Sequence, residues 1–363
     1  MKAFYLIASV FLFVLISPAQ EKENLVSSYS IVARDSLTGD LGIAVKSNIP
    51  AIGAIVPYAR TGIGVIAAQG MPNSSFGIQG LSLLERGVSA DQAGGEMINS
   101  DTGRNVRQLA IVDSRGNSYA YTGINCRYYS GHILGNGYSI QGNLLSGIEI
   151  LKAIEQTFLQ TSGDLSERLL RSVEAAQKLS NDRKAGQSAA LLVVRENGGF
   201  NGFDDHFVDI RVDGDSLPVV RLRQLYDLWQ ETYMFDARLR SIDDMNRKKK
   251  FIAADTEKKR LAESFNMQLR RSPADPNLLN KIAWILATKE IDKEQAIELA
   301  KRAVRLVPNE VSYLETLAEC HYRLNHIDEA IAIESELASK DPANDRHWRQ
   351  LQKFREAKMK SGN

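Results

Sequence analysis

The sequence predicts an α+β layered sandwich in its first part and an all-α region of helical repeats in its second part. Two observations carry this prediction. Of the 26 glycines, 25 lie at or before Gly214, whereas all three tryptophans, Trp229, Trp284 and Trp348, come after it. In the first part, short apolar runs gather in blocks that helical stretches separate, which favours antiparallel sheets covered by helices over a βαβ alternation.

The predicted elements of the first part follow one another as strands, helices, strands, helices and strands. Apolar runs on either side of the turn residues 35–40 predict a hairpin at the start. Helical spacing of apolar residues predicts the helices, and short apolar runs predict the other strands. The strands are expected within 29–47, 54–56, 62–69, 108–113, 117–122, 138–141, 187–195 and 207–212, and the helices at 71–86, 90–99, 148–159 and 165–179.

An internal repeat marks the second part. Ala296 is matched by Ala330, and Pro308 by Pro342, in both cases 34 residues further on. This pattern resembles tetratricopeptide repeats, in which small alanines lie where the helices of a pair cross closely and a proline closes each unit. The resemblance covers residues 275–342 and implies a protein partner for the helices.

The N-terminus has the pattern of a secretory signal peptide. Lys2 precedes a 14-residue apolar run, residues 3–16, and the small residues Ser17 and Ala19 follow it. A transmembrane helix is the alternative, but the run is shorter than the roughly 20 apolar residues that a bilayer requires. We therefore expect a periplasmic or secreted protein that has no membrane association after cleavage behind Ala19.

Composition excludes several classes of protein. With 363 residues and 44% hydrophobic residues, the chain is neither disordered nor a disulfide miniprotein. Lys and Arg number 45 against 44 for Asp and Glu, and neither half is basic enough to indicate nucleic-acid binding. Cys126 and Cys320 lie in different parts, so a bridge between them is possible, but two unpaired thiols are the simpler interpretation.

The common catalytic motifs are missing. The sequence contains no Walker loop, Gly-x-Ser-x-Gly elbow, His-Glu-x-x-His or Cys-x-x-Cys pattern. The histidines are few and scattered, so we expect no three-histidine metal centre and predict no metal or cofactor. His132 lies in the glycine-rich stretch 131–137, which is more typical of a surface loop than of a ligand site. The remaining candidate for catalysis is a nucleophile that needs no histidine, namely an N-terminal Ser, Thr or Cys whose own α-amine serves as base.

Several blocks in the first part carry a resemblance to a known family. They are SYSIVARD at 28–35, LGIAVKS at 41–47, GAIVP at 53–57, GIGVIAAQ at 62–69, QGNLL at 141–145, and DR at 182–183 followed by QSAALL at 187–192. Together, over residues 28–228, they resemble the family catalogued as domain of unknown function 1028, which is placed in the N-terminal nucleophile (Ntn) hydrolase superfamily. The resemblance implies an Ntn-hydrolase-like αββα four-layer sandwich.

The resemblance also implies a nucleophile. Many members of the family begin this block with a threonine behind the initiator methionine or a processed leader, and Ser28 stands in that place. Ser28 Oγ would attack an amide carbonyl while its freed amine takes the proton, provided that the leader 20–27 is also removed. Ser30, which shares a strand face with Ser28, is the alternative nucleophile.

Supporting residues follow by position in the family. The backbone N–H groups of Ala68, Gln69 and Gly70 are candidates for the oxyanion hole. Proteasome-type relatives have an acidic residue at the position of Lys46 in this chain. They also have a lysine near the position of Ala54, where this chain is apolar. Both differences depart from the pattern of an efficient protease. Lys46 is expected either to lower the pKa of the Ser28 amine or to be an exposed lysine at the strand end.

Three further polar residues complete the predicted site. Asn143 is a candidate for orienting the substrate or the oxyanion, and Asp182 and Ser188 stand where relatives keep a supporting Asp and Ser. Turn formation alone would also explain Asn143 and Asp182.

The domains expected from these arguments are a signal peptide at 1–19, a leader at 20–27, an Ntn-hydrolase-like domain at 28–228, a helical linker at 229–274, two tetratricopeptide-like repeats at 275–342, and a capping helix and tail at 343–363. The expected function is hydrolysis of an amide bond in a small, peptide-like or cell-envelope-derived substrate. A non-catalytic envelope ligand-binding or adaptor protein is the alternative, and a scaffold that acts through the repeats alone is a third hypothesis. The sequence leaves oligomerisation open.

Overall fold

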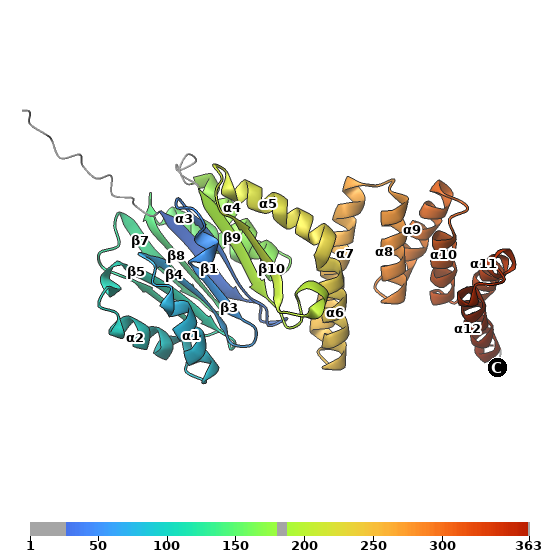
Figure 1. Cartoon of the computed structure of the whole chain (residues 1–363), viewed down its shortest axis with the longest axis horizontal. Helices are drawn as coiled ribbons and strands as arrows, with labels where there is room; N and C mark the ends of the chain where they lie inside the picture. The colour runs from blue at the N-terminus through green and yellow to red at the C-terminus, as the bar shows by residue number, and fades with distance from the viewer. Residues whose placement is uncertain (1–26, 180–186, 362–363) are drawn as a thin grey trace, which may run out of the picture.

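The computed structural model describes residues 27–179 and 187–361, and its first part consists of two antiparallel sheets (Figure 1). The six-stranded sheet has the order β10-β9-β2-β1-β8-β7, with β1 Ser28–Arg34, β2 Leu41–Ser47, β7 Tyr129–Gly135, β8 Tyr138–Leu145, β9 Ser188–Val194 and β10 His206–Val212. The four-stranded sheet has the order β3-β4-β5-β6, with β3 Pro57–Arg60, β4 Gly64–Gly70, β5 Arg107–Asp113 and β6 Ser118–Thr122. The predicted signal peptide, residues 20–26 of the predicted leader and Asp182 lie outside the described residues.

The predicted hairpin at the start of the sandwich is confirmed, and its turn explains why β1 pairs with β2. The Asp35 carboxylate accepts hydrogen bonds from the backbone N–H groups of Leu37 (2.9 Å) and Thr38 (3.1 Å), as in an Asx turn. Gly39 takes a φ of +84°, which glycine adopts without steric cost. The turn thus sets the register in which Arg34 pairs with Leu41.

Helices cover the outer face of each sheet. Helices α3 Glu149–Gln160, α4 Leu165–Leu179 and α5 Pro218–Trp229 pack on the six-stranded sheet. Helices α1 Ser75–Glu85 and α2 Ala90–Ser100 pack on the four-stranded sheet. A separate apolar core, which includes Val32, Ile43 and Val65, fills the space between the two sheets. The predicted α+β class is confirmed.

Three sequence-based details differ from the structure. The expected strand at 54–56 is partly a 3₁₀ turn, Ile52–Ala54, and β3 follows it instead. The helix expected at 71–86 begins only at Ser75: Gly70 at φ +78° ends β4, and Asn73 Oδ1 accepts hydrogen bonds from the Ser75 N–H and hydroxyl where the helix starts. The stretch 131–137, taken as a surface loop, largely belongs to β7, an edge strand that is half-buried or exposed along its length.

The second part is all-α, as predicted, and extends from the sandwich to the C-terminus (Figure 1). Its helices are α6 Phe235–Arg247, α7 Phe251–Arg271, α8 Pro276–Thr288, α9 Lys293–Leu306, α10 Val311–Arg323, α11 Ile327–Lys340 and α12 Asp345–Ser361. The fully buried alanines Ala283, Ala296 and Ala300 let neighbouring helices approach closely. The predicted division after residue 228 falls at the end of α5, which passes through a π-helical turn, Gln230–Met234, into α6. In the described part of the chain, no helix is long and apolar enough to span a membrane.

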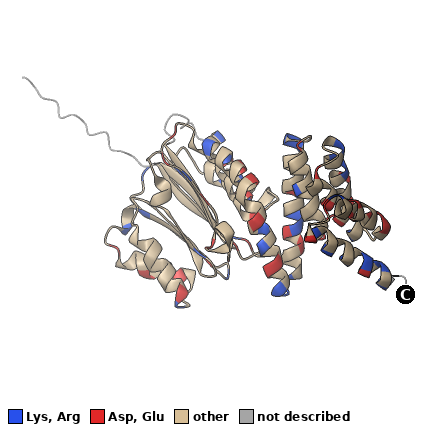
Figure 2. Cartoon of the chain, turned by 45° about the vertical axis from the view of Figure 1, so that its right-hand side comes forward, with Lys and Arg blue, Asp and Glu red and all other residues tan. Residues whose placement is uncertain are grey.

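Acidic and basic residues crowd the helices of the second part, whereas the strands carry few (Figure 2). Some of these charges are buried where the two parts meet. Arg195, at the end of β9, forms ion pairs with Asp40 (2.6 Å) and with Glu257 of α7 (2.8 Å). Arg238 of α6 bridges Glu257 (2.6 Å) and Asp164 in the same way. We call these five residues the junction network, and every member is at most 4% exposed.

Candidate functional site

Ser28 is the first residue of β1, a central strand of the six-stranded sheet. The register places Ser28 opposite Ser47 of β2 and Asn143 of β8, and Ser47 opposite Ser188 of β9. Directly opposed residues on antiparallel strands point to the same face. Ser188, Ser47, Ser28 and Asn143 therefore form one polar row across four strands, on the face that looks toward the second sheet, as Val32 does.

Hydrogen bonds at the centre of the polar row hold Ser28. Its Oγ lies 2.7 Å from Ser47 Oγ, and Ser47 Oγ also donates to the Ser27 carbonyl (3.2 Å). Ser27 is fixed in turn, because its N–H donates to Asn48 Oδ1 (2.7 Å) and its carbonyl accepts from the Asn48 N–H (3.0 Å). Ser28 is 1% exposed.

The two ends of the polar row have different contacts. Ser188 Oγ donates to the Ile49 carbonyl (2.5 Å) and accepts from the Ile52 N–H (3.1 Å), so it fixes the loop that follows β2. Asn143 Oδ1 accepts a hydrogen bond from Ser130 Oγ (3.0 Å). The Nδ2 group of the same amide is therefore its donor end. The sequence thus identified three of the four members of the row and missed Ser47.

A second set of polar side chains connects the two sheets beside the row. Ser30 Oγ donates to Gln69 Oε1 (2.7 Å), and Gln69 Nε2 donates to Gln108 Oε1 (3.0 Å). Gln108 Nε2 reaches back to the Gly142 carbonyl on β8 (2.8 Å). Ser30 shares the face of Ser28, as expected, but its hydroxyl is part of this amide chain, and sequence reasoning missed Gln108.

Lys46 lies on the other face of the sheet from Ser28. It pairs with Tyr29, and its Nζ is 5.8 Å from the centre of the Tyr29 ring. Tyr29 belongs to the core beneath the helices, and its hydroxyl reaches the Val173 carbonyl of α4 (3.5 Å). Lys46 is 1% exposed, so it is not the exposed strand-end lysine of one prediction. A one-residue offset along a strand places side chains on opposite faces, which separates Lys46 from the polar row.

The predicted oxyanion residues at the end of β4 have other partners in this chain. The Ala68 N–H donates to the Val56 carbonyl (3.2 Å), and the Ala68 side chain belongs to the core under α1 and α2. The Gln69 side chain reaches Ser30 rather than Ser28. Gly70 adopts the left-handed conformation that turns the chain out of the sheet.

Three further side chains of chemical interest are His132 and Cys126 of the sandwich and Cys320 of α10. His132 is an exposed residue whose Nδ1 lies 2.9 Å from Thr122 Oγ1, and partial burial of the ring lowers its pKa. Cys126 and Cys320 both carry free thiols. Burial raises the pKa of Cys320 to about 12, so this thiol is protonated at neutral pH.

The fold and the row define an α+β domain of two antiparallel sheets with a buried serine at the start of a central strand. A family model described as "Family of unknown function (DUF1028)" matches residues 28–222. This match spans more than half of the chain, and the chain therefore belongs to that family.

Two solved structures show similarity to part of the chain. The crystal structure of protein SPO2555 from Silicibacter pomeroyi, also assigned to DUF1028, shares 28% identity at a TM-score of 0.52, over 56% of this chain and 89% of that one. The second TPR domain of human RPAP3, solved in complex with an HSP70 peptide, shares 14% identity at a TM-score of 0.24, over 32% of this chain and 92% of that one. The second likeness is too weak to assign a fold to the helices. No curated protein matches the chain.

Proposed function

We propose that the sandwich is an exported Ntn-type hydrolase, with Ser28 as nucleophile, that cleaves an amide bond in a small or cell-envelope-derived substrate. One observation carries this proposal. Ser28 is at once the first residue of a central strand, the first residue of the family match and a member of a polar row between the sheets. The four-layer arrangement of helices, sheet, sheet and helices supports an Ntn-like fold.

The chemistry needs no histidine. Ser28 Oγ attacks the amide carbonyl while the Ser28 α-amine takes the hydroxyl proton, because an α-amine with a pKa near 8 is a suitable base. The C–N bond then breaks, the leaving amine receives that proton, and the acyl group stays on Oγ as an ester. Water hydrolyses the ester and restores the hydroxyl. Asn143 Nδ2, on the neighbouring strand, is the proposed donor to the oxyanion.

Removal of residues 1–27 is what would activate the site. In the unprocessed chain the Ser28 nitrogen belongs to a peptide bond, and the Ser27 carbonyl accepts hydrogen bonds from Ser47 Oγ and the Asn48 N–H. Cleavage behind Ser27 creates the α-amine and removes one partner of Ser47, whose hydroxyl can then donate to Ser28 Oγ alone. Ser30 has no comparable route, since it lies two residues inside β1, and a chain that began there would lack the first two residues of the strand.

The alternative is a non-catalytic binding or adaptor protein built on the same sandwich. The close packing around Ser28 favours it, because Ser28 is almost fully buried and Ser27 is held by hydrogen bonds at both its N–H and its carbonyl. In that case the mature chain keeps Ser27, and Ser28 has no free amine.

For the second part, we propose that the helices form tetratricopeptide-like repeats that bind a protein. A cavity of ≈ 460 Å³ supports this role. Its lining comes from α6, α8, α10 and α12 and includes Lys281, Trp284, Lys289, Glu315 and Arg346. Lys281 and Trp284 lie on the face of α8 opposite its buried residues Leu279 and Ala283.

The test is the N-terminus of the mature protein, combined with labelling of the nucleophile. Protein secreted from its native host is analysed by intact mass and N-terminal sequencing, then treated with a β-lactone, which acylates nucleophilic hydroxyls. We expect a chain that begins at Ser28 and one acyl group on that residue. Ser28→Ala should abolish labelling, and Ser30→Ala should retain it. A mature chain that keeps Ser27 would rule out the amine mechanism and favour the binding protein.

A further inference from the structure

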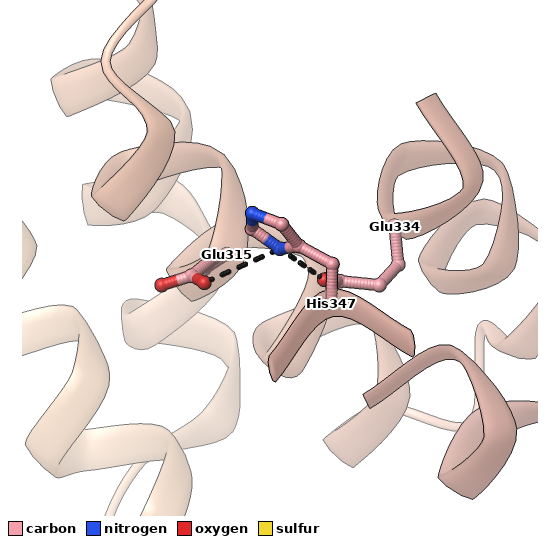
Figure 3. Close-up of side chains that lie close together, drawn as sticks. All are labelled: Glu315, Glu334 and His347. Carbon is pink, nitrogen blue, oxygen red and sulfur yellow. Dashed lines mark hydrogen bonds and ion pairs between the residues drawn. The ribbon is translucent and has the colours of Figure 1, made fainter. Parts of the chain in front are cut away.

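Three side chains of metal-binding type converge inside the helical part, away from the sandwich (Figure 3). Glu315 comes from α10, Glu334 from α11 and His347 from α12, and one potential ligand atom of each lies within 4.8 Å of the others. His347 Nδ1 is 2.9 Å from Glu334 Oε1 and 3.5 Å from Glu315 Oε1. Three consecutive helices thus bring two carboxylates to the same ring nitrogen.

Burial makes this arrangement costly without a further positive charge. Glu334 is fully buried and His347 is 2% exposed. Glu334 Oε2 is buried and has no hydrogen-bond partner in the described part of the chain, although Figure 3 shows its carboxylate reaching toward His347. Buried carboxylates are normally paired with a cation or with hydrogen-bond donors. The nearby cation Arg346 is largely exposed and contacts Glu315 Oε2 (3.1 Å), on the outer side of the cluster.

We propose that Glu315, Glu334 and His347 bind one divalent transition-metal ion, with Zn²⁺ as the preferred ion. Zinc is bound by imidazole nitrogen and carboxylate oxygen at about 2.0–2.2 Å, which places neighbouring ligand atoms about 3.4 Å apart in a tetrahedron. An octahedral ion at similar bond lengths places them about 3.0 Å apart. The 2.9 and 3.5 Å separations around His347 Nδ1 lie just outside the two ends of this range, and the ligand oxygens of the two carboxylates lie within 4.8 Å of each other.

The position of the cluster gives an ion a route of entry. Glu315 and Arg346 also line the ≈ 460 Å³ cavity between α6, α8, α10 and α12. Three protein ligands leave a fourth zinc position open. Water, or a carboxylate of a molecule docked in the cavity, is the ligand we expect there. The sequence prediction of no metal depended on the scarcity of histidine, but a carboxylate-rich site needs only one.

The experiment is a metal titration of the full-length, tag-free chain after treatment with a chelator. Isothermal titration with Zn²⁺ should give one ion per chain and raise the melting temperature, because the ion binds the folded state. Co²⁺ bound in its place should show the visible absorption of a tetrahedral site. Glu334→Gln should weaken Zn²⁺ binding at least about tenfold, since it removes one charged ligand. The control Glu329→Gln, an exposed position on the same helix, should bind as the wild type does.

A second variant tests whether a loss of affinity is due to misfolding. Glu315 lies at the edge of the cavity and is 13% exposed, so Glu315→Gln should keep the far-ultraviolet circular dichroism of the wild type and still lose affinity. Absence of saturable binding of Zn²⁺ or Mn²⁺ to the wild type would overturn the proposal. Equal affinity of the wild type and both cluster variants would also overturn it. The three side chains would then be only a hydrogen-bonded triad around His347.

Discussion

The sandwich and its junction with the helices bury polar side chains in opposite ways. Between the sheets the buried polar groups are neutral serines, glutamines and an asparagine, and some of them hydrogen-bond to one another, such as Ser30, Gln69 and Gln108. At the junction they are charged, as in Arg195 and Glu257. A neutral polar group changes the pKa of its neighbour less than a charged group does. The stability of a buried charge, in contrast, depends strongly on the charge that is paired with it. We infer that the polar row can host a nucleophile, and that the junction network fixes how the two parts join.

The largest effect should come from removing one charge of the junction network. Arg195→Met keeps an unbranched side chain to pack on the Phe207 ring, which the guanidinium now covers at 3.9 Å. It leaves Asp40 and Glu257 buried without their shared partner, and the expected loss of unfolding free energy is about 3–5 kcal/mol. Urea denaturation measures this loss. The control is Arg211→Met, because the Arg211 side chain is exposed and its ion-pair partner Asp209 is only half-buried, and it should change stability by less than about 0.5 kcal/mol.

A smaller effect should appear in the pH dependence of stability. Although burial alone would raise the pKa of Glu257, Arg195 and Arg238 lower it to about 2, below the ordinary value of 4.5. A carboxylate with a lowered folded pKa stabilises the protein fully above its unfolded pKa and loses that contribution as pH falls through the folded pKa. The expected loss between pH 4.5 and 2 is up to about 3 kcal/mol. Burial raises the pKa of Asp40, which offsets part of this loss.

The measurement is urea denaturation of wild type and Glu257→Gln across that pH range. The variant should lose most of the slope between pH 4.5 and 2, even if its stability at pH 7 is lower. Glu263→Gln, at an exposed position of α7, should keep the slope of the wild type. An unchanged slope in Glu257→Gln would show that another group controls acid unfolding.

Part of the site follows from the sequence because it is local. The turn at residues 35–40 pairs Arg34 with Leu41, and the same register places Ser28 opposite Ser47. Ser47 was therefore within reach of sequence reasoning, and so was the separation of Lys46 from Ser28, because side chains alternate along a strand.

The rest depends on long-range packing that no local pattern encodes. Asn143 and Ser188 are supplied by β8 and β9, more than 100 residues from Ser28, and only the strand order brings them to it. Arg195 and Glu257 each look like ordinary surface charges in the sequence, and only the docking of α7 buries them together. The edge strand β7 was missed because its half-exposed residues lack a clear apolar pattern.

The smallest effect is expected from substitutions within the polar row itself, where two serines can be compared. On the mature chain, Ser47→Ala removes the hydroxyl that contacts Ser28 Oγ, and we expect acylation of Ser28 to slow about tenfold, the equivalent of one neutral hydrogen bond. Ser188→Ala removes a hydroxyl that hydrogen-bonds to the loop residues Ile49 and Ile52, so acylation should keep its rate while stability falls by about 1–2 kcal/mol. Labelling rates from intact mass, with urea denaturation of the same samples, separate the two effects. Equal slowing in both variants would mean that the row acts on Ser28 only through the stability of the sheet, since Ser47 lies between Ser188 and Ser28 in the row.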